Sequence, residues 1–167
     1  MIAALLLIAS TGLTADLRVG QQSPAFEFES EDGLGNIKFP ASYTGKIILL
    51  DFWGVWCAPC RAEIPNVRKA YSDHHANGFE VLGAAMQHSD DQQILVKPFA
   101  RKNQMPWPQI NGRAIERLYG VTSIPFVLLV DGDSGKILAT TNQLRGPGLS
   151  NFIGRALAKK RQTPNPR

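Results

Sequence analysis

The sequence predicts an α/β fold: a central mixed β-sheet with helices on both faces, preceded by an N-terminal β-hairpin extension. Three patterns predict it. Residues 46–53 are almost continuously apolar, the following segment has apolar side chains at helical spacing, and two strand-like segments flank a glycine-containing turn near the C-terminus. A strand covered on both faces is apolar along its whole length, whereas a helix needs an apolar residue every three or four positions. Alternating strands and helices favour parallel pairing, and the late hairpin adds antiparallel strands.

The first half of the chain supplies the N-terminal hairpin and the start of the sheet. Residues 24–40 alternate apolar and acidic side chains around glycine-containing breaks, which is typical of a partly exposed hairpin. Residues 46–53 are expected to form the central strand. A helix over residues 57–76 should end at Asn77-Gly78, and Pro65 should kink it because proline removes one backbone hydrogen bond.

The second half continues the alternation. The expected elements are a buried strand at 79–86, a helix at 90–103, an extended segment at 104–110, a short helix at 113–119, two strands around a turn at 131–135, and a terminal helix at 150–161. Ser89 or Asp90 would cap the helix at 90–103, and Gly120 would end the short helix. The two late strands have the turn residues of a hairpin.

The chain length and the N-terminus bound the domain organisation. A chain of 167 residues with 44% hydrophobic residues suits one domain, expected at residues 16–161 and followed by a polar tail at 162–167. Residues 1–15 have the layout of a signal peptide, and their apolar run is shorter than the ~20 residues of a membrane span. A buried strand or helix is the alternative. Export would place the mature chain, without a stable membrane span, in an oxidising compartment.

The formal net charge of +4 does not indicate a nucleic-acid partner. The excess lies at residues 155–167, which hold basic and no acidic side chains, so the rest of the chain is nearly neutral. A short basic end rich in proline and polar residues is typical of a solvated terminus. We therefore expect no nucleic acid to bind.

The two cysteines of the chain, Cys57 and Cys60, lie in the sequence WCAPC just past the central strand. Sites of open α/β sheets collect at this edge. A structural disulfide is not needed in a chain of this size, and it would close only a short loop. A tetrahedral metal site needs further ligands, but His74 and His75 lie at the far end of the same helix, where we expect a surface histidine pair. A redox pair is favoured.

The redox interpretation gives the two cysteines different roles. A thiolate attacks a disulfide, and the N-terminus of a helix lowers a thiol pKa, so Cys57 would be the nucleophile. Cys60, one turn further on and more buried, would attack Cys57 to release the partner. Pro59 would fix φ between the two sulfurs. Trp56 would supply a flat rim beside the nucleophile, or simply pack at the edge.

With DFWGVWCAPCRAEIP at 51–65 and YGVTSIPFVLLVDGDSGKI at 119–137, the chain resembles the thioredoxin superfamily, and within it the TlpA/ResA-like exported thiol:disulfide oxidoreductases. The resemblance covers about residues 19–158 and implies a thioredoxin-like fold. It implies that Pro125 is a cis-proline facing the two cysteines, an isomer that is rare enough to need such a likeness. It also implies that Ile124 offers its backbone to a bound substrate chain.

The same resemblance implies roles for two acids. Asp51 matches the buried aspartate of thioredoxins, which has a raised pKa and accepts the proton of Cys60. Glu63 matches an acid that tunes thiol pKa values in ResA-like proteins. The alternatives are a solvated acid at a strand end for Asp51 and a helix-surface acid for Glu63.

We therefore expect an exported enzyme, in the periplasm or on the cell-envelope side, that reduces disulfide-bearing proteins through Cys57 and Cys60. It would be a monomer with no cofactor or metal and would take electrons from an upstream thiol donor. A copper(I)-binding chaperone, which soft thiolates suit, or a redox-inactive binding module is the alternative. A peroxidase is disfavoured because Gly54 and Leu50 stand where peroxiredoxins have Thr and Pro. The direction of exchange is not fixed by the motif, since CxxC proteins span about 150 mV.

Overall fold

The computed structural model describes residues 17–29, 36–89 and 94–162. The expected signal peptide and residues 163–167 of the expected tail lie outside these ranges. Within these ranges, five strands form one mixed sheet in the order β5-β4-β3-β6-β7, and two further strands form a separate hairpin. In the described part of the chain, no helix has the length and apolar character to cross a membrane.

The central strand is β3 (Ile47–Trp53), as its continuous apolar pattern predicted. It pairs in parallel with β4 (Phe79–Ala85) and antiparallel with β6 (Phe126–Asp131). The outer strands are β5 (Gln109–Asn111), parallel to β4, and β7 (Ile137–Thr140), antiparallel to β6. The mixed sheet and the late hairpin are confirmed.

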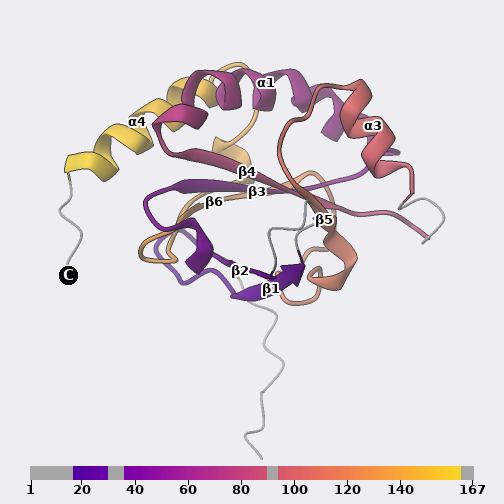
Figure 1. Cartoon of the computed structure of the whole chain (residues 1–167), viewed down its shortest axis with the longest axis horizontal. Helices are drawn as coiled ribbons and strands as arrows, with labels where there is room; N and C mark the ends of the chain where they lie inside the picture. The colour runs from indigo at the N-terminus through magenta and orange to yellow at the C-terminus, as the bar shows by residue number, and fades with distance from the viewer. Residues whose placement is uncertain (1–16, 30–35, 90–93, 163–167) are drawn as a thin grey trace, which may run out of the picture.

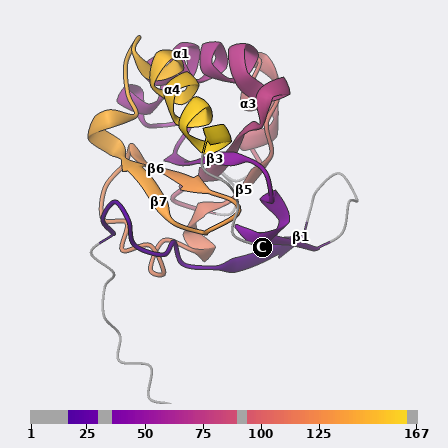
Figure 2. The same ribbon diagram turned by 90° about the vertical axis from the view of Figure 1, so that its left-hand side faces the viewer.

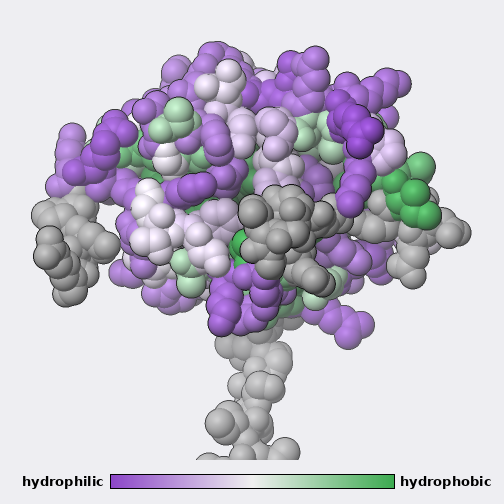
Figure 3. All heavy atoms as spheres, in the orientation of Figure 1, coloured by the Kyte–Doolittle hydropathy of each residue, from purple (hydrophilic) through white to green (hydrophobic). Residues whose placement is uncertain are grey.

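The described α-helices all cover one face of the sheet. These are α1 (Ala58–His74), α3 (Val96–Lys102) and α4 (Leu149–Gln162), and Figures 1 and 2 show them on the same side of β3. Their buried side chains join Leu49 and Trp53 of β3 in one hydrophobic core. The surface around them is largely hydrophilic, with an apolar cluster beside the start of α3, where residues 94–95 are exposed (Figure 3).

The opposite face is covered mainly by the hairpin of β1 (Phe26–Glu29) and β2 (Asn36–Phe39). Their aromatic side chains pack into a second core with the alternate residues of β3. The short 3-10 helix η1 (Ala41–Tyr43) contributes Tyr43 to the same core, and Ile115 of this core directly follows the 3-10 helix η3 (Gly112–Ala114). Helices therefore lie on both faces, as predicted, but the longer ones share one face.

The predicted helix at 90–103 is wrong at its start. The helix α3 begins at Val96, residues 94–95 form a turn, and residues 90–93 lie outside the described ranges. The two predicted capping residues are therefore too early to cap it. Pro98 explains the late start: proline has no N–H and is tolerated in a helix only in the first turn, where the N–H groups have no intrahelical partner.

The predicted helix at 113–119 is also wrong. Only the single 3-10 turn of η3 forms, followed by turns up to Gly120, which has the positive φ of 59° expected of a terminating glycine. The side chain of Asn111 accepts a hydrogen bond from the N–H of Arg113 and so caps this short turn. The extended segment before it contains the edge strand β5, which the sequence pattern did not predict because this segment is rich in proline.

Candidate active site

Cys57 and Cys60 are joined by a disulfide at the start of α1, with their Cα atoms 5.3 Å apart. Cys57 is the N-cap residue, and Pro59 lies in the first turn, where its missing N–H costs no hydrogen bond. The N–H of Cys60 donates to the sulfur of Cys57 over 3.2 Å. In the reduced protein the same N–H would face the Cys57 thiolate, and a helix N-terminus favours that anion.

The expected difference in burial between the two cysteines is wrong. Cys57 is 3% exposed and Cys60 is 4% exposed. Val55 and Ile124, from the loops before α1 and before β6, pack against the core that contains both cysteines. The two cysteines therefore differ in their position on α1 and not in their burial, since only Cys57 is the N-cap residue.

The Ile124-Pro125 peptide bond is cis, as the resemblance implied. The antiparallel register pairs Phe126 of β6 with Phe52 of β3. Pro125 therefore lies beyond this pair, at the carboxyl end of β3, the edge from which the chain continues to Cys57. Both Ile124 and Pro125 are partly exposed, so a bound chain could reach their backbone.

The Trp56 side chain is an exposed aromatic ring that neighbouring groups hold in place. Its side chain is 45% exposed, its Nε1 donates to the carbonyl oxygen of Met86 over 2.8 Å, and its ring stacks on His88 with centroids 4.3 Å apart. Gly54 makes this position possible, since a Cβ there would lie 2.9 Å from both the Met86 oxygen and Trp56 Nε1. Both interpretations of Trp56 therefore hold: its ring is exposed next to Cys57 in the sequence, and it also packs against its neighbours.

Asp51 points to the α1 face of the sheet, on the same side of β3 as Leu49 and Trp53. Burial raises the pKa of its carboxyl to about 7, the negative charge of Glu63 adds to this rise, and the positive charge of Arg145 opposes it. The alternative of an ordinary solvated acid is therefore wrong.

Glu63 is half-buried on α1 rather than a free acid of the helix surface. Its carboxylate accepts hydrogen bonds from the backbone N–H of Gly146 (2.8 Å) and from Asn66 Nδ2 (2.9 Å). Arg145 Nε lies 3.7 Å from the other carboxylate oxygen. Glu63 therefore connects the active-site helix to the loop that leads into α4.

A family model described as the AhpC/TSA family matches residues 19–140. The chain belongs to this family, a branch of the thioredoxin superfamily. Relatives of this AhpC/TSA chain include the thiol-disulfide oxidoreductase ResA of Bacillus thuringiensis subsp. konkukian, 30% identical over 124 residues that cover 73% of this chain and 68% of the relative. ResA of Bacillus anthracis is 30% identical over 142 residues, covering 78% and 76%.

Solved structures show the same fold as this AhpC/TSA-family chain. The thioredoxin domain of a thiol-disulfide oxidoreductase from Bacteroides vulgatus superposes with a TM-score of 0.71 at 26% identity, covering 84% of this chain and 99% of that one. A thiol:disulfide interchange protein from a Bacteroides species gives a TM-score of 0.69 at 26% identity, covering 85% and 91%. The fold, the cysteine pair and the relatives identify a thiol-disulfide oxidoreductase.

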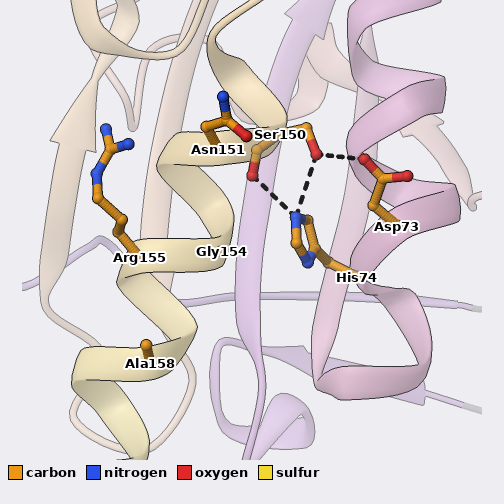
Figure 4. Close-up of a pocket in the computed structure, with 7 residues that line it drawn as sticks. All are labelled: Asp73, His74, Ser150, Asn151, Gly154, Arg155 and Ala158. Atoms are coloured by element: carbon orange, nitrogen blue, oxygen red, sulfur yellow. Dashed lines mark hydrogen bonds between the residues drawn. The ribbon is translucent and has the colours of Figure 1, made fainter.

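The histidines form no metal site with the cysteines. Among the described residues, no three His, Cys, Asp or Glu side chains are grouped as metal ligands would be. His74 is half-buried rather than at the surface: its Nε2 lies 2.8 Å from the carbonyl oxygen of Ser150 on α4 (Figure 4). His75 stacks on Tyr71 at the same far end of α1.

Sequence reasoning missed three groups around the site: His88, Arg145 and the N–H of Gly146. Each reaches the site from a loop far along the chain, and no spacing pattern connects it to the cysteines. A positive residue next to a glycine just before the terminal helix was the only available signal for the last two, and such a pair is common in loops.

Proposed function

We propose that the protein reduces disulfide bonds of exported proteins, with Cys57 as the attacking thiolate and Cys60 as the resolving thiol. The observation that carries this assignment is the Cys57 sulfur at the N-cap of α1, which accepts the N–H of Cys60. Helix N-termini stabilise thiolates, and the thiolate is the attacking form.

The exchange proceeds in two steps. The Cys57 thiolate attacks one sulfur of the partner disulfide, a mixed disulfide forms, and the second partner sulfur leaves as a thiolate. Cys60 then gives its proton to the Asp51 carboxylate and attacks the Cys57 sulfur, so that the Cys57–Cys60 disulfide forms and the first partner sulfur leaves. Two electrons pass to the partner, and an upstream thiol donor returns the protein to the dithiol.

The residues around the pair would hold the partner. Ile124 and Pro125 lie at the same edge of the sheet as Cys57, and their partial exposure supports contact between the Ile124 backbone and a bound chain. Trp56 would provide an apolar plate next to the reacting sulfur. Pro59 would keep the first turn rigid between the two sulfurs.

Export of the protein is part of the proposal and is supported by the N-terminal sequence alone. Residues 1–15 would be the signal peptide and residues 16–161 the exported domain. Fractionation of cells expressing the full chain, with N-terminal sequencing of the product, tests it. A product that keeps Met1 and stays in the cytosol would contradict export.

Trapping and redox equilibration test the reductase proposal. Cys60→Ser should accumulate mixed disulfides with protein partners, whereas the matched variant Cys57→Ser should accumulate none. Equilibration with glutathione should place the couple near the ≈ −270 mV of thioredoxin. A potential near the ≈ −120 mV of DsbA would make the protein an oxidant instead.

The competing functions are tested by the same variants. Peroxidase activity is disfavoured because a Thr at position 54 would need a Cβ where Met86 and Trp56 leave no room. For a copper(I) chaperone, Cys57→Ser should abolish copper binding but need not affect any disulfide reduction. Loss of insulin-disulfide reduction with unchanged copper affinity would leave only the enzyme.

A further inference from the structure

Two carboxyl groups, those of Asp51 on β3 and Glu63 on α1, interact electrostatically but have opposite surroundings. Glu63 accepts hydrogen bonds from Asn66 and from the N–H of Gly146, and Arg145 lies beside it. In the described part of the chain, no hydrogen-bond donor reaches the carboxyl of Asp51. Hydrogen bonds and a nearby cation favour the charged form of an acid, whereas burial disfavours it.

The loop that carries Arg145 is fixed at both ends. Leu144 is 2% exposed and Leu149 is 1% exposed, and both belong to the core under α1. Gly146 has a φ of 77°, a left-handed conformation that glycine adopts without strain, and in it the N–H points to Glu63. The Arg145 side chain is 37% exposed and that of Glu63 is 20% exposed, so the pair is partly shielded from solvent.

We propose that Arg145 is a positioning residue for the dithiol reaction: together with the Gly146 N–H it fixes the Glu63 carboxylate, and its own positive charge offsets the negative charge of Glu63, so that Asp51 is free to accept the proton released by Cys60. This inference rests on the proposed function. When two neighbouring acids have environments that separate their proton affinities, the acid and base roles follow from those environments.

The charges that face Asp51 come from two elements. Glu63 of α1 raises the pKa of Asp51, and Arg145 of the loop before α4 lowers it, on top of the larger effect of burial. The strand neighbours of Asp51 in the sheet, Gly83 of β4 and Val127 of β6, are uncharged. The two cysteines of α1 complete the set of titratable groups once the disulfide is reduced.

Opposite substitutions should therefore shift the proton transfer in opposite directions. Arg145→Ala removes the cation, so Asp51 should hold its proton to higher pH and accept the Cys60 proton less often at neutral pH. Glu63→Gln removes the neighbouring anion, so Asp51 should ionise at lower pH. A merely structural role of Arg145 would not produce shifts of opposite sign.

The reaction of the reduced protein with 5,5′-dithiobis(2-nitrobenzoate) separates the two steps. Attack by Cys57 releases one thionitrobenzoate, and attack by Cys60 on the mixed disulfide releases the second, which the absorbance records as a later phase. The rate of this second phase should rise with pH through a midpoint set by Asp51. Arg145→Ala should raise the midpoint by roughly 0.5 to 1 pH unit, and Glu63→Gln should lower it by a similar amount.

Two variants serve as controls. Arg145→Lys keeps the charge and should restore most of the wild-type midpoint, which separates the charge from any effect on folding. Arg155→Ala removes an arginine of α4 that lies over the Phe152 ring, and it should leave the midpoint unchanged.

An unshifted midpoint in Arg145→Ala, or shifts of the same sign in Arg145→Ala and Glu63→Gln, would overturn the role of Arg145 alone. If the wild-type protein releases the first thionitrobenzoate but never the second, Cys60 does not resolve the mixed disulfide. That result would overturn the proposed function and, with it, the inference.

Discussion

At the scale of single residues, Asp51 is a buried acid whose charged form the fold disfavours. Burial raises the pKa of its carboxyl from 3.8 to about 7, with Glu63 adding to the rise. An acid whose pKa is higher in the folded chain binds more protons there than in the unfolded chain. The free energy of unfolding therefore decreases as pH rises from about 4 to about 7, by at most about 4 kcal/mol from this group.

Asp51→Asn should stabilise the oxidised protein above neutral pH. We expect a gain of roughly 1 to 3 kcal/mol at about pH 8, below the limit given above, and little change at about pH 4. Guanidinium unfolding at both values measures it, with the exposed acid Glu27 changed to Gln as the control. If Asp51→Asn changes the free energy of unfolding equally at both pH values, ionisation of the Asp51 carboxyl does not destabilise the fold.

Gly54 allows the Trp56 side chain to adopt its position. A Cβ at this position would lie 2.9 Å from the Met86 carbonyl oxygen and from Trp56 Nε1, so Gly54→Ala should break their hydrogen bond and displace the ring from His88. We expect a changed tryptophan fluorescence and a severalfold slower reduction of a protein disulfide. Gly148→Ala, which meets nothing within 4 Å, is the matched control. An unchanged rate would leave Trp56 without a role in the partner contact.

At the scale of elements, α1 and α4 are joined at the end far from the cysteines. The hydroxyl of Ser150, 6% exposed at the start of α4, donates to Asp73 of α1 and lies 3.2 Å from His74 Nε2 (Figure 4). Ser150→Ala should lower the free energy of unfolding by about 1 kcal/mol without changing the redox rates. Urea unfolding measures it against Ser72→Ala, an exposed serine of α1. A changed rate of disulfide exchange would show that this contact also positions the active-site end of α1.

Elements with a strong local pattern were predictable. The apolar run of β3 and the helical spacing of α1 depend on few competing signals, and the cysteine pair lies at their junction. The helix α3 and the segment after Gly112 were not, because Pro98 allows α3 to begin only shortly before it and only the 3-10 turn η3 forms where the composition would permit a longer helix.

The site was predictable to the same extent. The cysteines and Asp51 belong to one contiguous motif, whereas Arg145 reaches Glu63 only through tertiary packing, which no local spacing encodes.

At the scale of the whole molecule, one lysine joins the last helix to the sheet. Lys160 near the end of α4 bonds to Asp131 and Asp133 at the turn between β6 and β7. Burial alone would raise the pKa of Asp131, but the hydrogen bonds from Lys160 and Ser134 and the charge of Lys160 together outweigh it and lower the value. The same lysine lowers the pKa of Asp133. The pKa of Lys160 is raised, because the two carboxylates outweigh its burial.

These shifts have a sign opposite to that of Asp51. An acid whose pKa is lowered by folding stabilises the fold above its unfolded value near 3.8 and loses this contribution as pH falls through its folded value. A lysine whose pKa is raised keeps its contribution below its unfolded value of 10.5 and loses it as pH rises through its folded value. The stability of the oxidised protein should therefore be greatest near pH 4, because the contribution of Asp51 is lost as pH rises above about 4 and those of Asp131 and Asp133 are lost as pH falls below about 4.

Lys160→Met tests this balance because it removes the cation and keeps an apolar side chain of similar length. The variant should lose stability across neutral pH, show a weaker decline below about pH 4, and lack the decline above about pH 10.5. Guanidinium unfolding of the oxidised protein across this range measures all three, with Lys159→Met beside it as the control. A stability maximum near pH 8 in the wild type would mean that ionising Asp51 costs little stability. If Lys160→Met loses as much stability below about pH 4 as the wild type does, this lysine does not stabilise the charged forms of the two aspartates.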